Sequence, residues 1–178
     1  CSSISRPLPP KPPNSLYNIL YNTRVSLVNE VPLRPAELEN IVGIKDCCAD
    51  LAQSFARTAT RPEEFLVLTG EDVLFHTTPY QGASDGTLTA VHVKTAAFAR
   101  LRALFPDNHR KVALSEWRGL VEVTQLLSRK PNPAAVKYWL YHTRLITSPA
   151  LHLLIMAANS ALRGMINAAD NAQELSIA

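Results

Sequence analysis

Short apolar segments alternate with segments of helical pattern over the first 105 residues, and this alternation limits the possible folds. The run Ile41-Val42-Gly43-Ile44 is apolar throughout, which is typical of a parallel strand buried on both faces. Strands that alternate with helices form parallel βα units with right-handed crossovers. The sequence therefore predicts an α/β fold, with strands expected at 15–19, 41–45, 65–69 and 87–91 and helices at 35–40, 49–60 and 71–80.

From residue 95 onward the pattern is helical. Asp107 or Asn108 is a plausible N-cap for the longest of the helices there. Residues 6–13 hold five prolines, which favour an extended tail. Helices are expected at 95–105, 107–129, 133–142 and 157–169, and the chain divides into a tail (1–14), a βα region (15–105) and a helical region (106–178).

Helical periodicity also predicts which side chains face inward. In the helix expected at 49–60, Leu51, Phe55 and Ala56 fall on one face. In the long helix, the inward face is expected to hold Leu114, Trp117, Leu120, Val121 and Leu127.

Lys45 ends the apolar run and is the most informative single residue. Burial disfavours a charged ammonium and favours the neutral, nucleophilic amine. A desolvated lysine is a common way to build a Schiff-base nucleophile for carbonyl substrates. The alternative is an exposed lysine at a strand end, since lysines are usually solvated.

Five motifs occur in an order and spacing that resemble the dihydrodipicolinate synthase / N-acetylneuraminate lyase family. Asn40-Ile41-Val42-Gly43-Ile44-Lys45-Asp46 resembles the Schiff-base lysine motif of that family, and the segment from Leu16 to Thr23 resembles its tyrosine strand. The other three similar segments are Leu68 to Asp72, Gly82 to Gly86 and Pro131 to Lys137.

The resemblance implies a (β/α)8 barrel followed by C-terminal helices, and an imine between the lysine and pyruvate or a related 2-oxo acid. A complete barrel needs roughly 250 residues, whereas this sequence has 178. The motifs belong to strands five to eight, and the first four units have no counterpart. The resemblance therefore implies a partial barrel, with residues 15–105 as its βα half.

The resemblance also assigns roles to three residues. Lys45 forms the imine, Tyr17 relays protons, and Thr87 presents its backbone carbonyl to the substrate. The alternative for Tyr17 is a tyrosine packed inside the barrel. No cofactor or metal is implied, and the five histidines show no ligand spacing. Asp46 and Asp50 could resemble a metal or acid–base pair, but are interpreted as charges at a helix start.

Several positions depart from the pattern of the family. Asn22 stands where dihydrodipicolinate synthases carry an arginine, which is closer to the hydroxy-oxoglutarate aldolase and sugar-acid branches. No G-T-T-G-E loop, which binds the pyruvate carboxylate in the family, occurs here. The remaining departures are Leu20 for proline, Arg24, Asp85 and Arg144 for glycine, and His92 for asparagine; a left-handed helix end at Arg144 would be strained.

Composition and charge narrow the choice of partners. The net charge is +3, with no basic stripe, so nucleic-acid binding is not expected. No apolar run approaches the ~20 residues of a membrane span. Cys47 and Cys48 are adjacent and are expected to be reduced in a cytoplasmic protein. Cys1 is interpreted as the start of a fragment or an altered reading frame, with a lipoprotein start as the alternative.

Two functions remain open. The first is a class I aldolase or synthase acting on a small 2-oxo acid such as pyruvate, as a homo-oligomer or together with a complementing half-barrel chain. The second is a non-catalytic half-barrel remnant with a structural or interaction role. An open half-barrel would expose sheet edges and an apolar inner face, which favours association.

Overall fold

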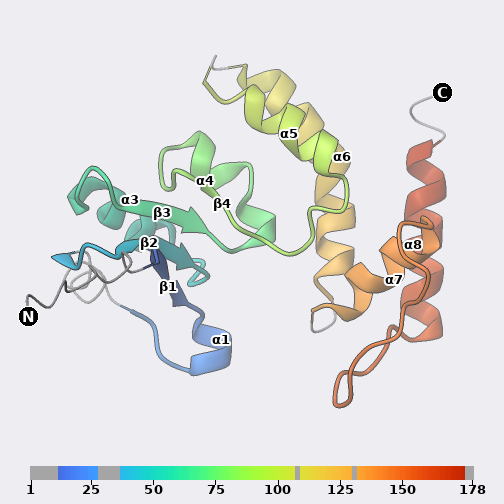
Figure 1. Cartoon of the computed structure of the whole chain (residues 1–178). Helices are drawn as coiled ribbons and strands as arrows, with labels where there is room; N and C mark the ends of the chain where they lie inside the picture. Colours follow the sequence, from blue (N-terminus) through green and yellow to red (C-terminus); the bar gives the residue numbers. More distant parts are fainter. Residues whose placement is uncertain (1–11, 28–36, 107–108, 130–131, 175–178) are drawn as a thin grey trace, which may run out of the picture.

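The computed structural model describes residues 12–27, 37–106, 109–129 and 132–174. Its centre is a four-stranded sheet in which all neighbouring strands are parallel. The spatial order β1-β2-β3-β4 equals the chain order, as expected for consecutive βα units (Figure 1). The α/β prediction is therefore confirmed, with strands β1 Asn14–Asn18, β2 Ile41–Asp46, β3 Leu66–Thr69 and β4 Gly86–Thr87.

Side chains alternate across this sheet, so its two faces differ. Ile44 and Val67 point to one face and are buried with Phe65 in a small apolar cluster. Tyr17 and Leu66 point to the other face and are 48% and 47% exposed. Parallel sheets normally have both faces covered, and in the described residues only the first face is.

Gly43 allows β2 and β3 to approach each other closely. A Cβ at this position would lie 2.4 Å from the backbone oxygen of Leu66, which is too short for any side chain. The glycine in the apolar run is therefore needed for strand pairing.

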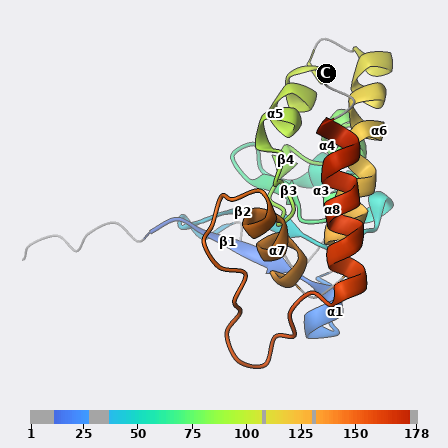
Figure 2. The ribbon, with the colours of Figure 1, turned by 90° about the vertical axis from the view of Figure 1, so that its right-hand side faces the viewer.

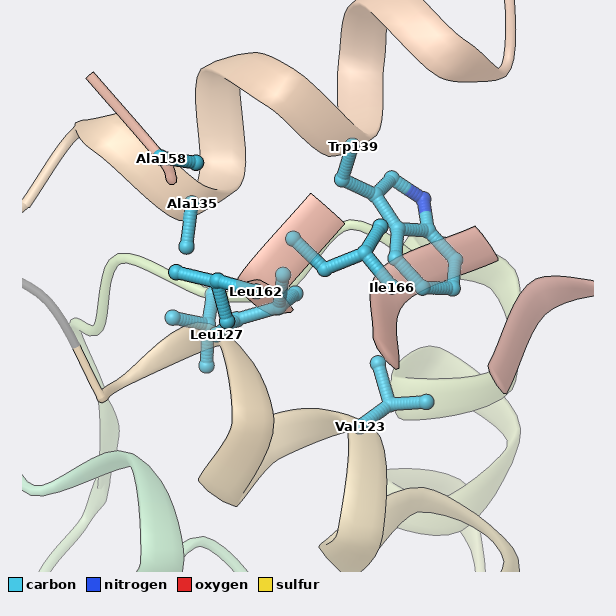
Figure 3. Packing of buried hydrophobic residues seen from close by; sticks show 8 residues of the cluster. Val123, Leu127, Ala135, Trp139, Ala158, Leu162 and Ile166 are labelled. Atoms are coloured by element: carbon cyan, nitrogen blue, oxygen red, sulfur yellow. The ribbon is translucent and has the colours of Figure 1, made fainter. Parts of the chain in front are cut away.

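Helices follow the strands and then form a separate group beside the sheet (Figures 1 and 2). Val123 and Leu127 of α6, Trp139 of α7 and Ile166 of α8 meet in the larger core of this group (Figure 3). A second core joins Phe75 to α5 and α6. The helices are α1 Leu20–Thr23, α3 Leu51–Thr60, the 3-10 helix η2 Asp72–Leu74, α4 Thr77–Tyr80, α5 Thr95–Ala103, α6 Arg110–Leu127, α7 Ala134–His142 and α8 Ser160–Glu174.

The structure corrects several expected boundaries. The strand expected at 87–91 is only two residues long, and the helix expected at 71–80 is split into η2 and α4. Residue 37 is in 3-10 conformation, whereas 38–40 form a bend and a turn rather than the end of an α-helix, and α1 was not predicted. Asp107 and Asn108, and the tail up to residue 11, lie outside the described residues, while Asn14 already belongs to β1.

The inward faces were predicted in part. In α6, Trp117, Leu120 and Leu127 are buried, while Leu114 and Val121 are half-buried. In α3 the prediction is wrong, because Phe55 and Ala56 are exposed, Leu51 is half-buried, and the buried residue is Arg57. Apolar periodicity cannot find an arginine that is held inside by an ion pair.

At two of the positions where the family pattern has glycine, the arginine found here adopts a left-handed backbone conformation. Arg24 has φ 58° at the end of α1, and Arg144 has φ 60° just after α7. The strain predicted at Arg144 is therefore present. Asp85 differs, because its carboxylate accepts a hydrogen bond from the Val67 N–H at 2.7 Å and pairs with Arg61.

The substitution Arg144→Gly is expected to stabilise the chain by about 0.5–1 kcal/mol. A left-handed conformation costs an L-residue roughly 1–2 kcal/mol, and the greater freedom of glycine in the unfolded chain offsets part of that gain. Urea unfolding measures the difference. The control is Arg118→Gly in the middle of α6, which should destabilise by about 1 kcal/mol. Equal losses in both variants would contradict the strain argument.

Candidate active site

Lys45 and Tyr17 meet at the carboxyl ends of β1 and β2. They are register partners across the two strands, and they point to the same face of the sheet. The Lys45 Nζ lies 4.3 Å from the centroid of the Tyr17 ring, which is cation–π geometry. The two residues predicted to be catalytic are therefore brought together, with Lys45 half-buried.

Gly70 makes room for the lysine side chain. It follows β3, and its N–H donates to the Asp46 carbonyl at 2.7 Å. A Cβ at residue 70 would lie 2.1 Å from the Cys47 Sγ and 2.8 Å from the Lys45 Cε. The absence of a side chain here lets Lys45 extend across the strand ends.

A cavity of about 730 Å³ opens beside these residues. The β1–α1 segment, the end of β2, the turn after β3 and the end of α6 all contribute to its wall. Thr87 ends β4 and does not line the cavity, so its predicted contact with substrate stays a prediction. The lining residues are Tyr17, Ile19, Tyr21, Asn22, Lys45, Gly70, Glu71, Asp72, Val73, Ala90, Val91, Leu127, Ser128, Arg129 and Asn132.

The two acidic residues of the cavity have different surroundings. The Asp72 carboxylate accepts hydrogen bonds from the Ala90 and Val91 N–H groups, both at 3.1 Å, and so fixes the segment after β4. The Glu71 carboxylate accepts no hydrogen bond within the part of the chain that the structure describes. Glu71 is therefore available for chemistry, whereas Asp72 is already engaged.

The ionisable groups of the cavity influence one another. Burial, followed by the charges of Asp72 and Asp46, raises the pKa of Glu71, and the Lys45 charge opposes this. Burial also raises the pKa of Tyr17. The pKa of Tyr21 is raised to about 12, first through partial desolvation, although the residue is 67% exposed. Both hydroxyls are thus protonated near neutral pH.

The Cys47 thiol lies next to the hydroxyl of Tyr17. It is buried, and its Sγ lies 3.9 Å from the Tyr17 hydroxyl. Burial raises the pKa of the Cys47 thiol, so it remains an uncharged neighbour. Both Cys47 and Cys48 are free thiols.

A buried ion pair supports the strand ends from the opposite face of the sheet. Arg57 Nη1 lies 2.5 Å from Asp46 Oδ2, and both side chains are almost inaccessible to solvent. Asn18 donates to Asp46 Oδ1 at 2.8 Å and accepts from the Leu27 N–H, so β1 joins the same network.

The interpretation of Asp46 as a helix-start charge is therefore wrong. It is correct for Asp50, which caps α3 by accepting from the Gln53 N–H.

Glu71 and Tyr21 were not predicted as site residues. Glu71 lies inside a motif that was recognised, and its place directly after Gly70 was the signal that could have identified it. Tyr21 also lies inside a recognised segment, Leu16 to Thr23, but α1, the turn that carries it, was not predicted. Among the described residues no cluster of three or more histidine, cysteine or acidic side chains could hold a metal ion. None of their helices has the length and apolar character needed to cross a membrane.

Comparisons with known proteins identify the family of this chain. The profile of the dihydrodipicolinate synthetase family matches residues 10–166. The 4-hydroxy-tetrahydrodipicolinate synthase 2 of Clostridium acetobutylicum is 36% identical over 152 residues, covering 85% of this chain and 53% of that protein. The 4-hydroxy-tetrahydrodipicolinate synthase of Porphyromonas gingivalis is 30% identical over 153 residues, covering 85% and 51%.

Solved structures agree with the sequence comparison. A dihydrodipicolinate synthase from Bacillus anthracis superposes with a TM-score of 0.82 at 26% identity, covering 89% of this chain and 54% of that one. The pyruvate complex of the chloride-inhibited dihydrodipicolinate synthase from Acinetobacter baumannii gives 0.82 at 25% identity, with the same coverage. The sheet and helices thus match part of a (β/α)8 barrel, and the chain spans about half the length of these relatives. The chain belongs to the dihydrodipicolinate synthetase family.

Proposed function

We propose that this chain carries the Schiff-base half of a lyase or synthase site, in which Lys45 forms an imine with pyruvate or a related 2-oxo acid. The contact between the Lys45 Nζ and the Tyr17 ring, beside a cavity at the strand ends, is the observation that carries the proposal. Catalytic groups of barrels of this type gather at the carboxyl ends of the strands. A relative from Acinetobacter baumannii binds pyruvate.

The reaction proposed is nucleophilic catalysis by an amine. The neutral Lys45 amine attacks the keto carbon, the oxygen takes one proton from the nitrogen and one from an acid of the site and leaves as water, and a protonated imine remains. Loss of a proton from the adjacent carbon gives an enamine that can add to an aldehyde. Tyr17 is proposed to relay protons, and the backbone carbonyl of Thr87 to face the substrate.

A second half-barrel is proposed to complete the site. Strands β1 and β4 each have one edge without a partner strand in the described sheet, and Tyr17 and Leu66 are about half exposed on its inner face. Correct positioning can supply about 7–11 kcal/mol of barrier lowering, so an open site would be a weak catalyst. The completing half would be another copy, a complementary chain, or further residues of the same polypeptide.

Trapping of the imine tests the proposal. The purified chain is incubated with pyruvate, reduced with borohydride, digested and analysed by mass spectrometry. We expect an adduct on Lys45, none in Lys45→Arg, and an unchanged yield in Lys111→Arg, which removes an exposed lysine of α6. Labelling spread over many lysines, with equal yield in Lys45→Arg, would contradict imine formation at this site.

A non-catalytic half-barrel with a structural or interaction role is the second candidate. The left-handed arginines at 24 and 144 and the uncovered inner face favour it. Mixing the chain with the N-terminal half of the Clostridium acetobutylicum relative separates the two. A stable complex without a Lys45 adduct would favour the interaction role, and an adduct that appears only in the complex would favour a completed enzyme.

A further inference from the structure

We propose that Glu71 is the general acid–base group of this site and exchanges protons with Lys45 and the substrate oxygen during imine formation. The inference rests on the proposed function, because it assigns a role within the imine-forming step. It concerns a residue to which the recognised motifs give no role.

Glu71 lies at the same cavity as Lys45. It follows Gly70, whose backbone passes against the Lys45 side chain, and it lines the same cavity as Lys45 and Tyr17. Its carboxylate accepts no hydrogen bond from the described residues, whereas the neighbouring Asp72 carboxylate is held by two N–H groups. Glu71 is therefore the acid of the cavity that is not committed to the fold.

Glu71 interacts electrostatically with several ionisable groups of the site. Its charge raises the pKa of Tyr17, Tyr21 and Cys47, and the Lys45 charge acts on Glu71 in return. Burial raises the pKa of Glu71 above the ordinary value for glutamate, toward the range in which a carboxyl group both accepts and returns protons. The charged or titratable groups around it are Lys45, Asp46, Cys47, Asp72, Tyr17, Tyr21 and, on the α6 side of the cavity, Arg129.

The tyrosines are poor bases by comparison. With a pKa of about 12, Tyr21 is a phenolate in only about one molecule in 10⁵ at pH 7. The pKa of Tyr17 is also raised. A hydroxyl can pass a proton along, but a carboxylate is the group here that can take one from the Lys45 ammonium.

The proposed step is balanced in protons. The Glu71 carboxylate removes one proton from the Lys45 ammonium, and the amine attacks the keto carbon. A second nitrogen proton moves to the alkoxide, with Tyr17 available as the relay, to give a neutral carbinolamine. Glu71 then returns its proton to the hydroxyl, which leaves as water as the C=N bond forms, and a protonated imine remains.

The test measures the initial rate of imine formation with pyruvate as a function of pH, by borohydride quenching at timed intervals. It uses the full chain, alone or with the completing half, whichever gives the wild-type adduct. The base must be deprotonated, so the wild-type rate should fall as pH drops through the Glu71 pKa. Glu71→Gln should slow the step by about 10²–10⁴-fold and remove this inflection.

Two variants and one end point separate the outcomes. Glu71→Asp should keep the inflection at a reduced rate, and Glu64→Gln, at an exposed position, should behave as wild type. Given long incubation, Glu71→Gln should still reach the Lys45 adduct. A wild-type rate with the inflection intact in Glu71→Gln would overturn this inference alone, whereas no adduct in the wild type under either condition would overturn the proposed function and the inference with it.

Discussion

A Gly70→Ala chain is expected to lose the Lys45 adduct almost completely. The new methyl group would lie 2.1 Å from the Cys47 Sγ and 2.8 Å from the Lys45 Cε, and neither separation is possible between non-bonded heavy atoms. Cys47 is only 3% exposed and has little room to move. The aliphatic part of the Lys45 side chain and the turn after β3 must therefore shift. A misplacement of about 1 Å can already cost about 10²-fold in rate.

Adduct yield under the trapping conditions and the reactivity of Cys47 toward a thiol reagent measure this effect. We expect the yield to fall to the level of Lys45→Arg, and Cys47 to be modified faster as the turn is displaced. Gly164→Ala is the matched control, because no atom lies within 4 Å of its added Cβ in α8. That variant should gain up to about 1 kcal/mol of stability and keep the full yield. Normal trapping by Gly70→Ala would contradict the proposed path of the lysine side chain.

The core of the site follows from short-range sequence patterns. An apolar strand that ends in Lys45 and a strand that contains Tyr17 need only parallel pairing for the two side chains to meet, because strand ends coincide at one edge of the sheet. The alternation of strands and helices already predicts that pairing. This step does require two strands whose partner residues, Tyr17 and Lys45, are far apart in the chain, and the alternation of strands and helices is the pattern that predicts their pairing.

Other features depend on contacts that no local pattern records. Arg57 is buried because its guanidinium donates a hydrogen bond to the carboxylate of Asp46, eleven residues earlier. Apolar periodicity therefore selected the wrong face of α3. Asp72 accepts the hydrogen bonds that hold the segment after β4. The Glu71 carboxylate is therefore left available at the cavity, which the sequence alone does not show. The strand expected at 87–91 ends at Thr87, and the N–H groups of Ala90 and Val91 bond to the Asp72 carboxylate rather than to a neighbouring strand.

Replacing Arg57 with methionine is expected to destabilise the chain by about 3–5 kcal/mol, the usual cost of leaving one buried charge without its partner. Methionine fills much of the space but leaves the Asp46 carboxylate buried without its cation. It also removes the donor to the Leu27 carbonyl at 2.9 Å. Since the free energy of unfolding of a domain is about 5–15 kcal/mol, this one substitution would remove a large fraction of the stability of the chain. Urea unfolding measures it, with Arg100→Met at an exposed position of α5 expected to stay within about 0.5 kcal/mol of wild type.

The double variant Arg57→Met with Asp46→Asn shows whether the loss comes from the charge. An asparagine has no charge to compensate and can still accept the Asn18 hydrogen bond, so the pair should recover at least half of the stability lost in Arg57→Met. The two residues are in contact, and their effects should therefore not add. If the two losses simply added, the ion pair would not be what joins α3 to the strand that carries Lys45. If the losses add, the yield of the Lys45 adduct in the double variant should also fall. If the double variant regains stability, Lys45 should stay in position and the adduct yield should be kept.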